Sequence, residues 1–427
     1  MASCEFKNRI KCVILIGGPS KGTRFRPLSL DIPKPLFPIA GLPMIQHHIE
    51  ACAKLENLSE IVIIGSYHFS EILDFIHEMK NLYSLTINYS QESTPLGTAG
   101  GLNRFCGQKC DNTEYLFVMN GDVCADFPLQ DLLNFHCEKK ALITIMATET
   151  TRQQSSNYGC MVLDKHNEVH HYVEKPSTFV SSLINCGVYV MQTNIFHEMY
   201  HLFRTDQEKQ NVGEHLNGNN NGAACLSLEE DIFTKLVGTG RMFALPVKNW
   251  WSQVKTAGAA IYANRHYLSL YRERKPDRLT SVINHEDKII GDVYIHPTAT
   301  VDPTCVLGPN VSIGENAFIG RGVRIRESIV LNNAKILDHS IILNSIIGTY
   351  CFVGEWARVE GTPCDPNPNK PFAKMENPPL FNDNGKLNPA ITILSSNVNL
   401  AREKFVLNSV VLPHKKLTRN YKNEIVL

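Results

Sequence analysis

Short apolar runs and amphipathic stretches alternate along the first part of the chain. Two amphipathic stretches, residues 43–55 and 70–82, repeat their apolar side chains at helical spacing. Four apolar runs rich in aliphatic and β-branched side chains predict buried strands: residues 11–16, 60–67, 85–91 and 114–123. Strands that alternate with helices predict an α/β domain with a mixed, mostly parallel sheet.

A different pattern begins at residue 295, where an aliphatic side chain recurs at every sixth position. These positions are Ile295, Val301, Leu307, Ile313, Ile319, Ile325, Leu331, Leu337 and Leu343. Two places before the last eight stand residues that are small or aliphatic, Lys335 apart: Ala299, Cys305, Val311, Ala317, Val323, Ile329, Lys335 and Ile341. A six-residue period fits neither a helix nor an alternating strand, and it predicts a parallel β-helix with an aliphatic core.

Two segments interrupt these patterns and predict the domain organisation. Residues 266–288 are polar and charged, so we expect them to link a first domain, residues 1–265, to a β-helix domain, residues 289–427. Within the β-helix, the repeat stops after Glu360 and resumes at Ile391. The insertion, residues 361–390, is rich in Pro and Asn, and proline cannot continue a ladder of strands. A loop of this length is either functional or disordered.

Composition narrows the class of protein. The 427 residues include 42 Lys plus Arg and 42 Asp plus Glu, so the net charge is zero and no polyanion partner, nucleic acid or membrane surface, is expected. The 13 cysteines are scattered without zinc spacing, which favours reduced, buried thiols. The first residues lack the apolar segment of a signal peptide, and no run of about 18 apolar residues exists. We therefore expect a cytoplasmic protein.

A glycine-rich turn follows the first predicted strand. Gly17, Gly18 and Gly22 would allow backbone N–H groups to approach phosphate oxygens closely. Arg24 adds a bidentate cation, and Lys34 a point charge on a stiff segment between two prolines. The pattern favours a triphosphate site, although a plain strand–helix turn with surface arginines remains the alternative.

A second glycine-rich stretch follows the strand at residues 85–91. Gln91 and Glu92 can hydrogen-bond to a base edge or to ribose hydroxyls, while Gly97 and Gly100 leave room for a flat ring on the backbone. The alternative is an ordinary glycine-rich loop before a helix.

Carboxylates and a lysine mark two further strand ends. Asp122 follows a buried strand, and a carboxylate there suits Mg²⁺, although it could also cap a turn. Glu174 could accept hydrogen bonds from sugar hydroxyls, Lys175 could hold a sugar phosphate, and Asn185 would line the same pocket. The alternative for Glu174 and Lys175 is a turn with a surface ion pair.

The four motifs and the β-helix stand in the order found in sugar-nucleotide pyrophosphorylases. The whole chain resembles the mannose-1-phosphate guanylyltransferase family, and "GGPSKGTRFRPLS", "PKPLFPIAGLPMIQHHIEAC" and "EGTPCDPNPN" look like its regulatory, alpha-type branch. The resemblance implies a Rossmann-like nucleotidyltransferase domain followed by a left-handed parallel β-helix. The family reaction joins mannose 1-phosphate to the α-phosphate of GTP with Mg²⁺, forming GDP-mannose and pyrophosphate.

The resemblance also implies roles for individual residues. Thr98 would lie beside the guanine together with the glycines around it, and Asp122 would bind the metal. If the chain is catalytic, Arg24, Lys34 and Asp122 would carry the chemistry. The triphosphate would be held by Gly17, Gly18, Gly22, Thr23, Arg24 and Lys34, and the sugar phosphate by Glu174, Lys175 and Asn185.

Two departures from the family pattern concern catalysis. The loop "GGPSKGTR" is two residues longer than the GG-x-GTR of catalytic members, and Gln253 stands where they carry a second metal carboxylate. A neutral amide lacks the charge that helps to hold Mg²⁺ between phosphates. The sequence therefore predicts a regulatory subunit that binds GDP-mannose, with Glu92 and Gln253 as contacts, and restrains a catalytic beta-type subunit. Self-association is also expected, and residues 361–390 are a candidate arm toward the partner.

Two alternatives remain open. The first is an active mannose-1-phosphate guanylyltransferase, because Arg24, Asp122 and Lys175 are present. The second is an acyltransferase built on the β-helix, for which His296 and His339 are the available histidines.

Overall fold

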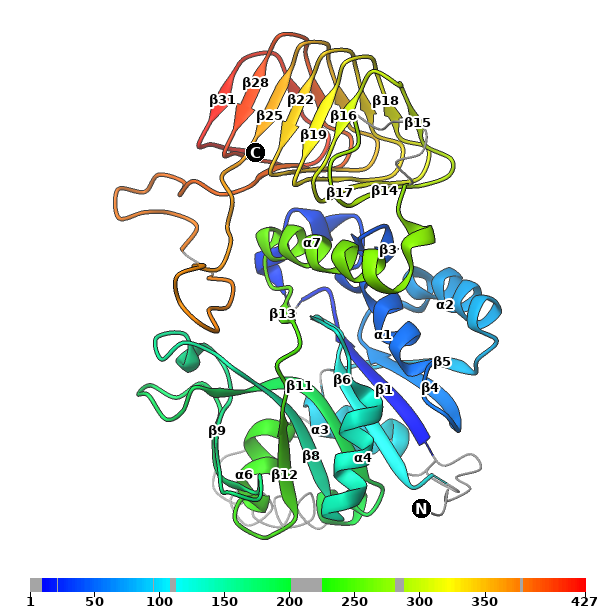
Figure 1. Ribbon diagram of the computed structural model, residues 1–427, viewed down its shortest axis with the longest axis vertical. Coiled ribbons are helices and arrows are strands. Elements are labelled where there is room, and N and C mark those ends of the chain that lie inside the picture. The colour runs from blue at the N-terminus through cyan, green and yellow to red at the C-terminus, as the bar shows by residue number, and fades with distance from the viewer. Residues whose placement is uncertain are drawn as a thin grey trace, which may run out of the picture. The chain divides into compact units, whose positions relative to one another are not determined.

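The computed structural model describes residues 10–20, 22–94, 96–107, 113–200, 225–280, 288–376 and 379–427 (Figure 1). Residue contacts divide the chain into two compact units. The first comprises Met1–Lys21, Ile45–Trp251 and Pro368–Lys374. The second comprises Gly22–Met44, Ser252–Asn367 and Met375–Leu427.

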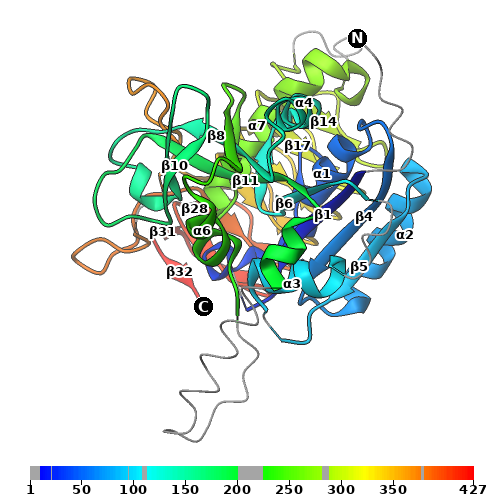
Figure 2. The same ribbon diagram turned by 90° about the horizontal axis from the view of Figure 1, so that it is seen from below.

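A nine-stranded sheet forms the centre of the first unit. Its order is β10 (Val169–Val173), β9 (Cys160–Leu163), β11 (Leu183–Gln192), β6 (Tyr115–Asn120), β1 (Ile10–Gly17), β4 (Leu58–Gly65) and β5 (Ile87–Gln91), while β8 (Ile143–Glu149) pairs with β11 and with β12 (Met242–Pro246). Strands β6, β1, β4 and β5 are parallel, whereas β11 runs antiparallel to β6 and to β8. Figure 2 shows β11, β6, β1 and β4 side by side. The predicted α/β domain with a mixed sheet is confirmed.

Helices accompany the parallel half of this sheet, as the alternating pattern predicts. Helix α2 begins with a capping box, in which the side chain of His68 accepts from the backbone of the first turn and Glu71 bonds back to the backbone of His68. Its buried residues, Ile72, Phe75, Ile76 and Met79, recur at helical spacing and face the core. The helices are α1 (Met44–Cys52), α2 (Phe69–Tyr83), α3 (Gly97–Cys106), α4 (Leu129–Lys139) and the short α6 (Thr234–Leu236), which continues a π-helical turn at Leu228–Phe233.

The second unit contains α7 and the β-helix. Helix α7 spans Ala257–Arg274, so residues 266–274, which we expected to belong to a connecting segment, are helical. Of that segment, residues 281–287 lie outside the described residues. Three stacks of parallel strands follow, and in Figure 1 their coils run from yellow-green to red.

The strands of the three stacks alternate along the chain. The first stack is β14 (Val293–Ile295), β17 (Val311–Ile313), β20 (Ile329–Val330), β23 (Ser345–Ile347), β26 (Thr392–Leu394), β29 (Val410–Val411) and β32 (Ile425–Val426). The second is β15 (Thr300–Val301), β18 (Phe318–Ile319), β21 (Lys335–Ile336), β24 (Phe352–Val353), β27 (Asn399–Leu400) and β30 (Lys416–Leu417). The third is β16 (Val306–Leu307), β19 (Arg324–Arg326), β22 (Ile341–Leu343), β25 (Arg358–Glu360), β28 (Phe405–Leu407) and β31 (Tyr421–Lys422). The predicted parallel β-helix is confirmed.

The register of the β-helix departs from the strict six-residue period after Ile325. Ile313 pairs with Val330, not with Leu331, because the side of the coil that contains β20 is one residue shorter. From there on the buried core residues are Val330, Ile336 and Ile342. The prediction that Leu331, Leu337 and Leu343 continue the core row was therefore wrong, and Leu337 and Leu343 are only half-buried. Lys335 fits this register, since its side chain is exposed beside the buried Ile336.

The corners of the coils use left-handed backbone conformations. One corner places Asn316, Asn333, Tyr350, Asn397 and His414 at positive φ in successive coils. Asparagine tolerates this conformation better than most residues, which explains its frequency at the corners. Tyr350 departs from that preference, and its side chain is 62% exposed.

The insertion lies between β25, which ends at Glu360, and β26, which begins at Thr392. The strands on either side still pair in order, β23 with β26 and β25 with β28, so the β-helix continues past the insertion. The coils are thus interrupted between β25 and β26. Among the described residues, no helix combines the length and the hydropathy that a membrane crossing needs.

Candidate functional site

The carboxyl ends of the parallel strands bring several predicted residues to one edge of the sheet in the first unit. The backbone N–H of Ser66, after β4, donates to the carbonyl of Gly17 at 2.7 Å. The N–H of Gly121, after β6, donates to Leu15 O at 2.8 Å, which holds the turn before Asp122 against β1. A side chain at Gly18 would overlap the Ser66 hydroxyl, so a larger residue there would force Ser66 to change its rotamer. Ligands bind at such an edge in open α/β sheets.

The remaining residues of the predicted triphosphate loop belong to the second unit. Gly22 has φ +76° and precedes a short 3₁₀ turn at Thr23–Phe25, on which the side chain of Arg24 is exposed. The aliphatic part of Lys34 lies beside Gly22, 3.5 Å from the position that a Cβ would occupy. Gln253, at the end of β13 (Trp251–Gln253), also belongs to this unit and is half-buried.

The predicted base-binding stretch is tied to a distant segment of the first unit. The backbone of Leu226 fills the face of Gly97 that would carry a Cβ, and Gly97 has φ +79°. The N–H groups of Ala99 and Gly100 donate to Leu226 O at 3.0 and 3.4 Å. The carboxylate of Glu92 lies against Gly101, while Gln91 is exposed at the end of β5. These glycines are therefore needed for close packing of the chain on itself.

The predicted sugar-phosphate residues form one hydrogen-bonded group. Lys175 Nζ lies 2.7 Å from Glu174 Oε1, and the hydroxyl of Tyr172 donates to Glu174 Oε2 at 3.0 Å. Asn185 Nδ2 bonds to the hydroxyl of Tyr172 at 3.1 Å and to that of Tyr189 at 2.9 Å. The structure thus brings Glu174, Lys175 and Asn185 together, and it adds two tyrosines that the sequence did not single out.

Glu229 extends this group to the base-binding stretch and was also missed. Its Oε1 accepts from the hydroxyl of the buried Tyr189 at 3.1 Å, and its Oε2 accepts from Thr98 Oγ1 at 3.0 Å. Ser227 caps the π-helical turn that starts at Leu228, and its hydroxyl donates to Glu229 Oε2 at 2.9 Å. A serine followed by three acidic residues could have predicted the helix start, but not contacts to residues far along the chain.

The electrostatics keep the tyrosines of this group protonated. Burial raises the pKa of Tyr172, and the nearby Glu174 carboxylate raises it further. Burial likewise raises the pKa of Tyr189, with a further contribution from Glu229. The hydrogen bond to Glu174 raises the pKa of Lys175, so its ammonium stays charged. The tyrosine O–H groups are thus committed to Glu174 and Glu229, and Lys175, whose side chain is 61% exposed, is the cation that the group presents to an anionic ligand.

Asp122 lies between β6 and β7 (Val123–Ala125) and is half-buried. Within the described part of the chain, the one cluster of three potential metal ligands is Asp164, Glu168 and His170, on the β9–β10 hairpin. In that cluster Asp164 accepts the N–H groups of His166 and Glu168, as in an ordinary turn. Asp122 stays the predicted Mg²⁺ ligand, and as one carboxylate it would have to share the ion with phosphates and water.

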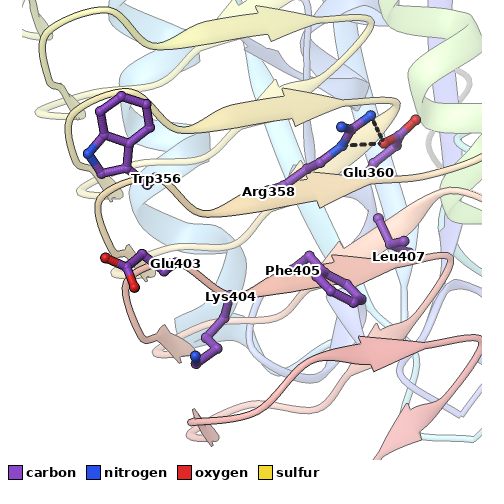
Figure 3. A pocket seen from close by; sticks show the side chains of 7 residues that line it. All are labelled: Trp356, Arg358, Glu360, Glu403, Lys404, Phe405 and Leu407. Atoms are coloured by element: carbon purple, nitrogen blue, oxygen red, sulfur yellow. Dashed lines mark hydrogen bonds and ion pairs between the residues drawn. The ribbon is translucent and has the colours of Figure 1, made fainter.

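The β-helix carries a shallow groove of about 350 Å³ on its third stack (Figure 3). Arg358 and Glu360 form an ion pair of 2.6 Å on one wall. The lining residues are Trp356, Arg358, Glu360, Glu403, Lys404, Phe405 and Leu407. No histidine lines this groove: His339 stacks on Trp356 with ring centroids 4.4 Å apart, and His296 bonds to Thr298. Neither histidine of the acyltransferase alternative is thus among the residues that line the groove.

Comparisons with known proteins agree with this architecture. Residues 11–264 match the family described as "Nucleotidyl transferase", and residues 289–426 match "GMPPB C-terminal domain". A crystal structure of a putative glucose-1-phosphate thymidylyltransferase from Bacillus anthracis matches 62% of this chain and 96% of its own, at 19% identity and a TM-score of 0.49. The fold and the two family matches define a nucleotidyl transferase domain joined to a parallel β-helix.

Relatives that match over almost the whole chain define its family more narrowly. "Mannose-1-phosphate guanylyltransferase regulatory subunit alpha" of Drosophila melanogaster is 57% identical over 438 residues, with 98% of this chain and 100% of the relative covered. The "regulatory subunit alpha-A" of Danio rerio is 51% identical and the "regulatory subunit alpha" of Rattus norvegicus 50% identical, at the same coverage of both chains. The chain belongs to the family of mannose-1-phosphate guanylyltransferase regulatory subunits alpha.

Proposed function

We propose that the first unit binds GDP-mannose and that the chain thereby restrains a catalytic, beta-type guanylyltransferase subunit. The observation that carries this proposal is the hydrogen-bonded group from Lys175 to Thr98. Its tyrosines, carboxylates and amide position one another, and this is how a binding site is preorganised. The names of the relatives agree with a regulatory role.

Two features of the predicted triphosphate site argue against strong catalysis by the chain itself. Catalysis would need Arg24, Lys34 and Asp122 around a triphosphate with Mg²⁺, which supplies charge neutralisation on the phosphates. Gln253 provides an amide where catalytic members have a second carboxylate, and the glycine loop is longer. A finished nucleotide sugar needs no such metal cage, so binding can persist where turnover is lost.

Partners follow from this role. The regulatory effect requires a complex with the beta-type subunit, and GDP-mannose must bind one arrangement of that complex better than another. The insertion, residues 361–390, is the candidate arm toward this partner, and self-association of the chain is part of the proposal. The compartment proposed for this complex is the cytoplasm.

The test combines a binding and a turnover measurement on the purified chain. Calorimetric titration should show binding of GDP-mannose. An assay with GTP, mannose 1-phosphate and Mg²⁺ should show negligible turnover by the chain alone. Added to the beta-type subunit, the chain should slow it more strongly as GDP-mannose rises. Robust turnover by the chain alone would favour the alternative, an active guanylyltransferase, and Asp122→Ala should then abolish it.

A further inference from the structure

We infer that Glu229 is a positioning residue that joins the base half of the nucleotide-sugar site to its sugar half, so that the site selects the complete nucleotide sugar over the nucleoside diphosphate. This inference rests on the proposed function, since it assumes that GDP-mannose binds in the first unit. It assigns a role to a residue that lies in none of the four sequence motifs.

The two halves of the site meet at the carboxylate of Glu229. One oxygen, Oε2, accepts from Thr98, at the start of α3 on the base side. The other, Oε1, accepts from Tyr189, whose hydroxyl also receives Asn185 Nδ2 on the sugar side. Each oxygen therefore accepts a hydrogen bond from a different half of the site. A displacement of the carboxylate would change the hydrogen bonds of both halves.

The network continues from Asn185 to the outer end of the sugar side. Asn185 bonds to Tyr172, Tyr172 bonds to Glu174, and Glu174 pairs with Lys175. Every contact in this chain is between 2.7 and 3.1 Å, so there is no weak step between Thr98 and Lys175. On the base side, Thr98 Oγ1 also accepts the N–H of Leu228 at 2.8 Å, which anchors the hydroxyl to the turn that carries Glu229.

Several features make this network stiff. Tyr189 is fully buried, Tyr172 is 4% exposed, and the ring of Phe233 contacts both edge-on, at 5.2 and 5.6 Å. Ser227 gives Glu229 Oε2 a second hydroxyl donor at 2.9 Å. The two halves are therefore held in a fixed relation before a ligand binds, and a ligand that contains both parts orders few side chains when it binds. The consequence is selectivity for the molecule that contains both parts.

The experiment measures selectivity rather than affinity alone. The dissociation constants of GDP-mannose and of GDP are determined by calorimetry for the wild type, for Glu229→Gln and for the matched control Glu230→Gln. Glu230 is exposed on the same turn, and its charge also helps to raise the pKa of Lys175, but its side chain accepts none of the hydrogen bonds of the network. Its substitution therefore makes the same change of charge and leaves those hydrogen bonds in place. We expect Glu229→Gln to reduce the ratio of the two constants about tenfold, and Glu230→Gln to leave it within about twofold of the wild type.

A second pair of variants tests the connection. Thr98→Val and Tyr189→Phe each remove one hydroxyl that donates a hydrogen bond to Glu229. Thr98 lies on the base side of Glu229 and Tyr189 on the sugar side. If they act through Glu229, the double variant should lose little more selectivity than either single variant. Additive losses, or an equal weakening of GDP and GDP-mannose in Glu229→Gln, would overturn the inference.

The outcomes separate the inference from the proposed function. If the wild-type chain binds no GDP-mannose, the proposed function fails and the inference fails with it. If GDP-mannose binds but the selectivity of Glu229→Gln equals that of the wild type, the inference alone fails. Melting temperatures of all variants show whether a loss reflects unfolding, and the double-variant comparison decides the matter if Glu229→Gln is unstable.

Discussion

The side-chain amide of Gln154 forms two hydrogen bonds, one in each direction, with the backbone of Lys374. Its amide nitrogen donates to Lys374 O at 2.7 Å, and its amide oxygen accepts from Lys374 N at 2.8 Å. The side chain of Lys374 lies over the ring of Trp251, 5.7 Å from its centroid, and reaches the hydroxyl of Thr148 at 3.4 Å. Residues 368–374 of the insertion are thus held in place by specific contacts within the first unit.

The first prediction concerns this attachment. Gln154→Ala removes two backbone hydrogen bonds, worth about 1–2 kcal/mol together, so the segment should open about tenfold more often. Limited proteolysis with trypsin measures this opening at Lys374, since Pro371 prevents cleavage after Lys370. The control is Gln153→Ala, whose side chain makes one exposed contact with Lys370 at 2.9 Å. Equal rates of cleavage in the two variants would contradict the prediction.

The second prediction concerns pH. Burial lowers the pKa of Lys374, although Cys186 and Glu149 oppose the shift. The detached segment then binds more protons than the docked one between the lowered pKa and the ordinary value, so docking should strengthen as pH rises through that interval. Proteolysis by subtilisin between pH 8 and 10.5, normalised to Lys374→Met, measures the effect. A protection ratio that is constant over this range would contradict it.

The third prediction separates backbone conformation from packing at two glycines of the first unit. Gly97 and Gly238 both have positive φ, at +79° and +68°, but only Gly97 faces a filled space, the backbone of Leu226. Gly238→Ala should cost about 1 kcal/mol of unfolding free energy for its conformation. Gly97→Ala should cost at least about 2 kcal/mol more and weaken GDP-mannose binding, because the loop must move. Chemical denaturation and calorimetry check both values.

The fourth prediction concerns a corner of the β-helix. Tyr350 occupies a left-handed position where the neighbouring coils carry Asn333 and Asn397. Tyr350→Asn should raise the free energy of unfolding by about 0.5–1 kcal/mol, because asparagine tolerates this conformation and little buried surface is lost. Thermal unfolding measures the change. Asn333→Tyr, the reverse substitution one coil earlier, should lower the stability.

The fold could be predicted from the sequence because its two units use different hydrophobic periods. The register of the β-helix could be predicted only as far as Ile325, because the loss of one residue from a coil leaves a plausible aliphatic residue, Leu331, next to the true core residue, Val330. Lys335 was the visible sign of this change. A charged residue at a core position shows that the register has moved by one.

The candidate site could be predicted where a motif follows a strand. Glu174, Lys175 and Asn185 were found in this way, and the structure brings them together. Glu229 could not be found, because its partner Thr98 lies 131 residues away in the chain and only the fold brings the two together. The tyrosines were missed because a buried aromatic residue in a strand is more often part of the core.

The insertion enters and leaves the β-helix at almost the same point. Thr362 N donates to Ala390 O at 2.9 Å, and the flanking strands keep their partners. The two ends of the insertion are therefore held together by this hydrogen bond. The length and composition of the insertion can change without altering the pairing of the strands on either side. Over evolutionary time the sequence of such an insertion can therefore change while the β-helix that carries it stays the same.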